Sequence, residues 1–180
     1  MTKMVILDRD GVINHSEDDD ITTVDAWDPI PGSIEAISRL KKAGYLVTVA
    51  SNHSGIARGL YDEETLDLMH QKLQKLLGFR GTSIDGFFYC AHGPEANCIC
   101  RKPKPGLLFQ IAKQFDIDLT QTPLVGDNIS DVQAAKMANA QPILVRTGKG
   151  EYVMQNFPEA LDVPVYDDLA HFVRLTLRNR

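Results

Sequence analysis

The stretch "MVILDRDGVIN" (residues 4–14) joins an apolar run to a pair of aspartates, and this junction decides the fold class. The apolar residues 4–7 predict a strand that is buried on both faces, as in a parallel sheet. Asp8 and Asp10 follow where this strand ends, and Gly11 supplies a turn. Open α/β sheets bind their ligands at the C-terminal ends of strands, so both carboxylates are candidate site residues. An ordinary solvated loop is the alternative at this point.

Strand-like and helix-like segments alternate along the rest of the chain. Apolar runs predict four further strands, at 45–50, 84–90, 122–127 and 141–148. Helical spacing of apolar residues predicts helices at 31–44, 61–78, 106–117, 130–140 and 167–178. Five strand-then-helix units favour a doubly wound (Rossmann-like) α/β fold with a mostly parallel sheet flanked by helices. At 180 residues, a single domain spanning 1–180 is expected.

Composition and charge exclude several classes of function. The chain is 43% hydrophobic and 24% charged, as is normal for a globular protein. It has no run of 18 apolar residues, and its N-terminal apolar run is too short for a signal peptide, so we expect a cytoplasmic protein with no membrane contact. A net charge of −5 without a long basic run argues against nucleic acid as a partner. We expect a monomer.

Polar residues stand at the C-terminal end of each of the first four predicted strands: Asp8 and Asp10, then Ser51 and Asn52, then Cys90, then Asp127. Because the C-terminal ends of parallel strands lie on one edge of the sheet, these side chains converge. Converging carboxylates need a hard cation, and Mg²⁺ suits this role because it binds carboxylate oxygens and bridges to phosphates. A carboxylate can also act as a nucleophile that forms an aspartyl-phosphate. A second carboxylate can then transfer the proton, while a hydroxyl (Ser51) and an ammonium (Lys102) hold the phosphoryl oxygens.

Four motifs stand in the order typical of the haloacid dehalogenase superfamily of phosphatases: "DRDGVIN" (8–14), "SNHSGIARG" (51–59), "RKPKPG" (101–106) and "VGDNISD" (125–131). The resemblance covers about residues 4–150. It implies Asp8 as the nucleophile, Asp10 as the general acid and base, and phosphoryl contacts from Ser51 and Lys102. Mg²⁺ would be held by the Asp8 carboxylate, the Asp10 backbone carbonyl and Asp127. Larger members insert a cap domain, for which this chain has no room, so a capless phosphatase is expected.

All three cysteines fall within "CAHGPEANCIC" (90–100), together with His92. Cys90, His92, Cys98 and Cys100 match the ligand set of a closed structural Zn²⁺ site. The alternative is a set of reduced cysteines with a solvent-facing His92. A metal in this loop would order it and so position Arg101 and Lys102 for phosphate at small entropic cost.

Two capless, zinc-bearing branches of the superfamily resemble this chain. One acts on a heptose bisphosphate in nucleotide-activated heptose biosynthesis, for lipopolysaccharide core or a related glycoconjugate, and the other acts on histidinol phosphate. "SGIARG" (54–59) and "RKPKPGL" (101–107) favour the first branch. That resemblance implies contacts with a phosphorylated sugar from Ser16, Glu17, Asp18, Asp19, Asn52, His53, Ser54, Arg101 and Asn128.

This chain departs from the usual residues of the heptose branch at three of its positions. Ser51 replaces threonine and keeps the hydroxyl, His53 replaces glutamine, and Asn128 stands where some members have lysine. A non-catalytic protein that binds a phosphorylated ligand is a further alternative. It would be indicated by loss of Asp8 or another motif residue, and none is lost.

Overall fold

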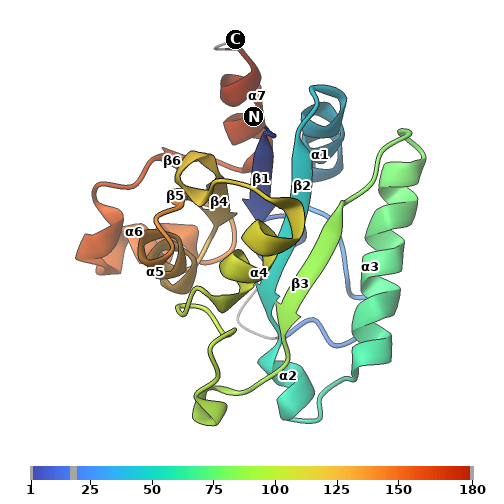
Figure 1. The fold of residues 1–180 in the computed structure, drawn as a ribbon. Helices are drawn as coiled ribbons and strands as arrows, with labels where there is room; N and C mark the ends of the chain where they lie inside the picture. The colour runs from blue at the N-terminus through green and yellow to red at the C-terminus, as the bar shows by residue number, and fades with distance from the viewer. Residues whose placement is uncertain (1, 17–19, 179–180) are drawn as a thin grey trace.

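The computed structural model describes residues 2–16 and 20–178, and within them six strands form one fully parallel sheet (Figure 1). The strands lie in the order β3-β2-β1-β4-β5-β6. Their bounds are Met4–Leu7 (β1), Leu46–Asn52 (β2), Gly86–Cys90 (β3), Pro123–Gly126 (β4), Gln141–Val145 (β5) and Val165–Tyr166 (β6). The chain winds from β1 to β3 on one side and from β4 to β6 on the other. The topological switch point therefore lies between β1 and β4.

Seven α-helices lie in the described part of the chain. Their bounds are Ser33–Lys42 (α1), Ser54–Ala57 (α2), Glu63–Gly78 (α3), Gly106–Phe115 (α4), Ile129–Met137 (α5), Gly150–Asn156 (α6) and Leu169–Arg178 (α7). Helices α1, α3 and α7 pack over one face of the sheet, and α4 and α5 pack over the other (Figure 1). This arrangement confirms the predicted doubly wound α/β class.

The strand β1 shows why both faces of the sheet are apolar. Val5 and Leu7 belong to the core beneath α1, α3 and α7, whereas Met4 and Ile6 belong to the core beneath α4 and α5. All four side chains are buried, so neither face of the strand meets water. A continuous apolar run is therefore the pattern that such a central parallel strand requires.

The structure differs from the sequence expectation mainly in its short elements. The prediction of five strands was wrong by one, because the edge strand β6 is only two residues long and carries no periodic signal. The four-residue α2 and the seven-residue α6 were also missed. The segment between β2 and β3 adds no separate layer, because Met69 and Leu73 of α3 are buried in the main core. No helix among residues 2–16 and 20–178 is long and apolar enough to cross a bilayer.

Candidate active site

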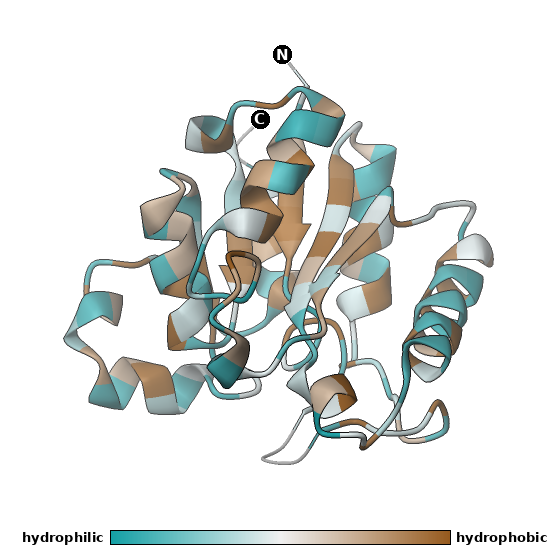
Figure 2. Ribbon diagram, turned by 60° about the horizontal axis from the view of Figure 1, so that its bottom comes forward, coloured by the Kyte–Doolittle hydropathy of each residue, from teal (hydrophilic) through white to brown (hydrophobic). Residues whose placement is uncertain are grey.

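The C-terminal ends of the strands open onto a cavity of about 380 Å³ that brings the predicted motif residues together. Figure 2 turns this edge of the sheet toward the viewer and shows the largely hydrophobic strands that lead to it. The residues that line the cavity are Asp8, Asp10, Ser16, Asn52, Ser54, Pro94, Arg101, Lys102, Pro103, Asp127, Asn128, Ser130 and Lys149. All four motifs contribute to this lining, as expected if the strand ends meet at one edge, although Ser51 of the second motif is not part of it.

Asp8 follows β1 at the switch point, and its side chain is held from two directions. The backbone N–H of Arg9 donates to Asp8 Oδ1 at 2.9 Å, and Lys102 Nζ donates to the same oxygen at 3.1 Å. Burial, with a smaller contribution from the Asp131 carboxylate, raises the pKa of Asp8 to about 7. A further positive charge beside Asp8 would therefore lower this pKa and stabilise the ionised carboxylate.

Lys102 is the buried cation of the site. Its ammonium donates to Asp131 Oδ1 at 2.5 Å, to the Ala50 carbonyl at 2.7 Å and to Asp8 Oδ1 at 3.1 Å, so each of its three hydrogens has an acceptor. Burial lowers the pKa of Lys102, but the carboxylates of Asp131 and Asp8 outweigh this effect and raise it overall. The side chain therefore stays charged although it is almost fully buried.

Asp127 lies across the switch point from Asp8, at the end of β4. Burial and the charges of Asp8 and Asp131 raise its pKa well above the ordinary value. Two glycines make room for its carboxylate, because a Cβ at Gly11 or at Gly148 would lie 2.1 Å from Asp127 Oδ2. Both glycines also have positive φ angles, of 83° and 58°, which favour glycine.

The carboxylates of Asp8, Asp127 and Asp131 bring oxygens within 4.8 Å of one another. The Lys102 ammonium pairs with two of these three acids, Asp8 and Asp131, so the group as a whole carries more negative than positive charge at this point. Repulsion between the carboxylates is one of the causes that raise the pKa values of Asp8 and Asp127. A small, hard divalent cation with oxygen ligands fits this set of residues.

The carboxylate of Asp10 is arranged differently from those three. Arg9 Nε donates to Asp10 Oδ1 at 2.8 Å, and Asn14 Nδ2 donates to the same oxygen at 3.0 Å. Burial is the largest single influence and raises the pKa of Asp10, but the Arg9 charge and the hydrogen bonds from Arg9 and Asn14, acting together with His53, hold it below the ordinary value. Asp10 is thus fixed at the cavity wall by a buried arginine that sequence reasoning did not single out.

Asn52 and Ser51 end β2 with different partners. The Asn52 amide donates to the Lys102 carbonyl at 2.9 Å and accepts from the Lys102 N–H at 3.0 Å, so it clamps the basic loop to the sheet. Ser51 Oγ lies 2.7 Å from His53 Nε2, and His53 Nδ1 lies 3.1 Å from the Tyr61 hydroxyl. Both Ser51 and His53 are 1% exposed.

The four predicted zinc ligands lie together at the end of β3 and in the following loop. The sulfurs of Cys90, Cys98 and Cys100 are 3.1–3.5 Å apart, and His92 Nδ1 lies 3.4–3.5 Å from two of them. A disulfide would need about 2.05 Å, so all three are thiols. Burial and the neighbouring thiols raise the pKa of Cys90 to about 12, a cost that a bound cation would relieve. Three sulfurs and one imidazole nitrogen fit Zn²⁺.

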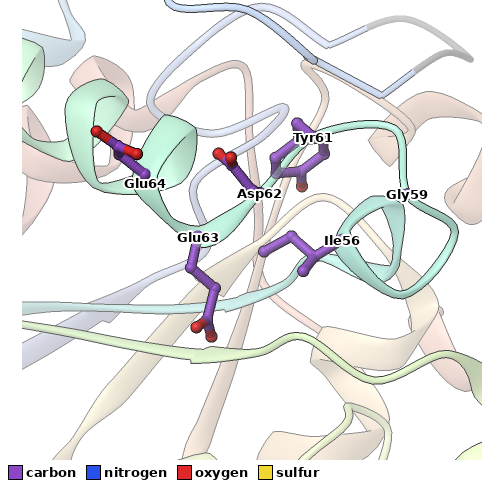
Figure 3. Close-up of a pocket in the computed structure, with 6 residues that line it drawn as sticks. All are labelled: Ile56, Gly59, Tyr61, Asp62, Glu63 and Glu64. Atoms are coloured by element: carbon purple, nitrogen blue, oxygen red, sulfur yellow. The ribbon is translucent and has the colours of Figure 1, made fainter.

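A larger cavity, of about 650 Å³, lies at the start of α3 (Figure 3). Its lining contains Asp62, Glu63 and Glu64 but no lysine or arginine. Such a surface repels phosphate, whereas the smaller cavity combines carboxylates with Arg101, Lys102 and Lys149. The smaller cavity is therefore the candidate active site.

Comparison with known proteins agrees with this geometry. The family model described as HAD-hydrolase-like matches residues 99–172. The D-glycero-β-D-manno-heptose-1,7-bisphosphate 7-phosphatase of Pseudomonas aeruginosa is 50% identical over 93% of both chains, and that of Bordetella bronchiseptica is 44% identical over 93% of this chain and 94% of its own. The chain belongs to this phosphatase family.

Solved structures of the heptose bisphosphatase family extend the likeness to three dimensions. The D,D-heptose 1,7-bisphosphate phosphatase of B. bronchiseptica, crystallised with magnesium and phosphate, is 41% identical, with a TM-score of 0.96 over 99% of this chain and 100% of its own. The enzyme of Burkholderia thailandensis is also 41% identical, with a TM-score of 0.76 over 98% of this chain and 99% of its own.

The structure places the predicted substrate contacts in three groups. Ser16, Asn52, Ser54, Arg101 and Asn128 line the cavity. His53 is buried, does not line the cavity, and lies within hydrogen-bonding distance of Ser51 and Tyr61. Glu17, Asp18 and Asp19 lie outside the described residues.

Sequence reasoning missed Asp131, the strongest partner of Lys102. It stands within the quoted motif "VGDNISD", four residues after Asp127, in the first turn of α5. There it also accepts from the backbone N–H of Asn128 in a capping box, at 3.1 Å. The sequence signal that could have indicated Asp131 is its spacing of four residues from Asp127, at the start of a predicted helix.

Proposed function

We propose that this protein removes the 7-phosphate of D-glycero-β-D-manno-heptose 1,7-bisphosphate through an aspartyl-phosphate at Asp8. The observation that carries the proposal is the position of the Asp8 carboxylate at the switch point, bonded to Lys102 and grouped with Asp127. The identity to heptose bisphosphatases over nearly the whole chain supports the choice of substrate.

Each motif residue has a role in this reaction. Bound Mg²⁺ would neutralise phosphate oxygens, and Asp8, Asp127 and the Asp10 backbone carbonyl would hold it. An oxygen of the Asp8 carboxylate attacks phosphorus, and the bond between phosphorus and the sugar oxygen breaks as the new bond forms. The Lys102 ammonium and the Ser51 hydroxyl stabilise the charge on the transferring oxygens.

Asp10 is the proton-transfer group in both halves of the reaction. It gives a proton to the departing sugar oxygen, then takes one from the water that attacks the Asp8-bound phosphorus and releases phosphate. The contact with Arg9 favours the ionised form of Asp10, which is the form that takes a proton from water in the second half of the reaction. The negative charge of a bound phosphate ester opposes this effect and favours the protonated form that the first half needs.

We further propose that residues 1–180 form one capless domain, active as a monomer in the cytoplasm. Three free thiols within hydrogen-bonding distance of one another are compatible with a compartment that keeps cysteines reduced. Without a cap, the residues at the cavity rim, which include Ser16, Ser54, Arg101 and Asn128, are available to select the substrate.

The substrate assignment predicts that kcat/KM for the heptose bisphosphate exceeds that for histidinol phosphate by more than about tenfold. A second phosphate gives the cavity a remote group to bind, and Arg101 offers a forked donor suited to it. Arg101→Ala should therefore cost about 1–3 kcal/mol of transition-state binding for the heptose bisphosphate. The ratio of its kcat/KM to that of histidinol phosphate should fall accordingly. Phosphate release from both substrates measures this.

Lys104→Ala is the matched control for that variant. Lys104 lies in the same basic loop, but its ammonium bonds to Asn97 and it does not line the cavity. Equal turnover of the two substrates by the wild-type protein would instead assign the chain to histidinol phosphate. Absence of release from either would favour a non-catalytic binding protein.

The thiol cluster predicts about one Zn²⁺ per chain, bound by Cys90, His92, Cys98 and Cys100. Removal of the metal should disorder the loop from 91 to 105 and weaken substrate binding, while the sheet persists. Elemental analysis of the purified protein, with titration of reactive thiols before and after chelation, measures this. A protein without zinc whose three thiols all react in the native state would contradict the prediction.

A further inference from the structure

Ser51, His53 and Tyr61 form a chain of hydrogen bonds behind the active-site cavity, in which Ser51 and His53 are buried and Tyr61 is half-buried. Ser51 Oγ lies 2.7 Å from His53 Nε2, and His53 Nδ1 lies 3.1 Å from the Tyr61 hydroxyl. Within the described residues, Ser51 Oγ has no other hydrogen-bond partner. Because the proposed function gives Ser51 a phosphoryl contact, the direction of its hydroxyl hydrogen matters.

The two ring nitrogens of His53 decide that direction. A neutral imidazole carries one N–H and one lone pair. If Nε2 holds the hydrogen, it donates to Ser51, and the hydroxyl of Ser51 keeps its own hydrogen for another acceptor. If Nδ1 holds the hydrogen, Ser51 must donate to Nε2 and then presents only lone pairs to a phosphoryl oxygen. Only the first tautomer lets Ser51 act as a donor to phosphate.

Tyr61 selects the first tautomer if its hydroxyl donates to Nδ1. Within the described residues, the Tyr61 hydroxyl has no hydrogen-bond partner other than His53 Nδ1, so its hydrogen is available to that nitrogen. The Tyr61 ring packs closely against Gly55, because a Cβ at Gly55 would lie 2.5 Å from Tyr61 Cε1. Tyr61 lies on the segment that leads from α2 into α3 (Figure 3).

The surroundings keep the imidazole neutral and in place. Burial, followed by the positive charge of Arg9, lowers the pKa of His53 well below its ordinary value. The rings of Tyr61 and Tyr89 both contact His53 edge-on, with centroids 6.4 and 6.3 Å away. His53 is thus held by its neighbours, and like Ser51 it is 1% exposed and does not line the cavity.

We propose that His53 and Tyr61 are positioning residues that hold the Ser51 hydroxyl as a hydrogen-bond donor to the transferring phosphoryl group. The inference rests on the proposed function, which places Ser51 at that group. His53 Nε2 supplies the hydrogen bond to Ser51, and the contact of Nδ1 with the Tyr61 hydroxyl fixes its direction.

A set of variants tests this positioning role by kcat/KM for phosphate release. Ser51→Ala and His53→Leu should each lower kcat/KM by about 10- to 100-fold, and the double variant should lose no more than the larger single loss. His53→Gln should recover most of the activity, because an amide can donate to Ser51 and accept from Tyr61. Tyr61→Phe should lower kcat/KM by about threefold or more.

Tyr89→Phe is the matched control, because Tyr89 also packs against His53 but its hydroxyl donates to Glu63. It should stay within about twofold of wild type. Additive losses in the double variant, or equal losses in Tyr61→Phe and Tyr89→Phe, would overturn the proposal. These comparisons are ratios to wild type, so they hold for whichever phosphate ester the protein hydrolyses.

Nitrogen NMR of isotope-labelled protein gives a readout that needs no substrate. We expect the His53 ring to show hydrogen on Nε2 in the wild type and in Tyr89→Phe, and a mixture of tautomers in Tyr61→Phe. Hydrogen on Nδ1 in the wild type would refute the proposal even if heptose bisphosphate is hydrolysed. A wild-type protein that is inactive on that sugar but carries Nε2–H would refute the substrate assignment alone.

Discussion

Asp8→Asn is expected to lower phosphate release by more than about a hundredfold while the fold remains intact. The asparagine amide cannot supply the carboxylate oxygen that forms the bond to phosphorus. Its shape is nearly the same, so the donation from Lys102 and the backbone contact of Arg9 can persist. Phosphate release, together with circular dichroism and the melting temperature, measures both parts of the prediction.

Asp118→Asn is the matched control for that variant. Asp118 is an aspartate far from the cavity that accepts from Thr120, so its loss should leave phosphate release unchanged. The Asp8→Asn protein should also remain stable, because the amide removes one negative charge from a buried group of three acids. Retained activity above about 1% of wild type would contradict the role of Asp8 as nucleophile.

The central strands could be predicted from sequence because burial on both faces determines their composition. A strand such as β1 must be apolar throughout, and its end is marked by Asp8. The edge strand β6 pairs with β5 through only two residues, Val165 and Tyr166, so tertiary contact defines it rather than its own pattern. The same holds for the four-residue α2, since a helix of this length is not stable by itself.

The site was predictable where a motif fixes both the residue and its place at a strand end. Asp8, Lys102 and Asp127 meet in one cavity for this reason. Partners that depend on packing were not predictable. Arg9 follows Asp8 in the sequence, yet its guanidinium is buried against Met69 of α3, a contact 60 residues away. No local pattern indicates such a contact.

The hydrogen-bond partners of the His53 ring could not be predicted from the sequence either. Its place within the second motif predicts a substrate contact. The structure gives both ring nitrogens protein partners, and one of these, Tyr61, lies eight residues further along the chain. The direction of a side chain at the end of a strand depends on what packs behind it, and a motif does not encode that.

The second large effect is expected at Lys102, where catalysis and stability depend on the same ammonium. Lys102→Met should abolish measurable phosphate release and lower the free energy of unfolding by about 3–5 kcal/mol. The stability loss arises because Asp8 and Asp131 would stay buried without the cation that bonds to both. Urea denaturation at neutral pH and phosphate release measure the two effects.

A second substitution separates the two roles of Lys102. In Lys102→Met/Asp131→Asn, one of the unpaired carboxylates becomes a neutral amide, so part of the lost stability should return. Phosphate release should not return, because the phosphoryl group still lacks its ammonium. A double variant that is less stable than Lys102→Met would contradict this account of the cluster.

Lys136→Met provides the matched control, because Lys136 pairs with Asp162 at the surface, where both side chains are exposed to solvent. Water screens such a pair, so its loss should change the free energy of unfolding by less than about 1 kcal/mol. Mg²⁺ should raise the stability of both variants, because both keep the acids of the cavity, and the gain should be larger in Lys102→Met, where Asp8 and Asp131 have lost their ammonium. Equal stability losses in the two methionine variants would mean that the buried acids do not depend on Lys102, and that the carboxylate cluster at the switch point is balanced by another group.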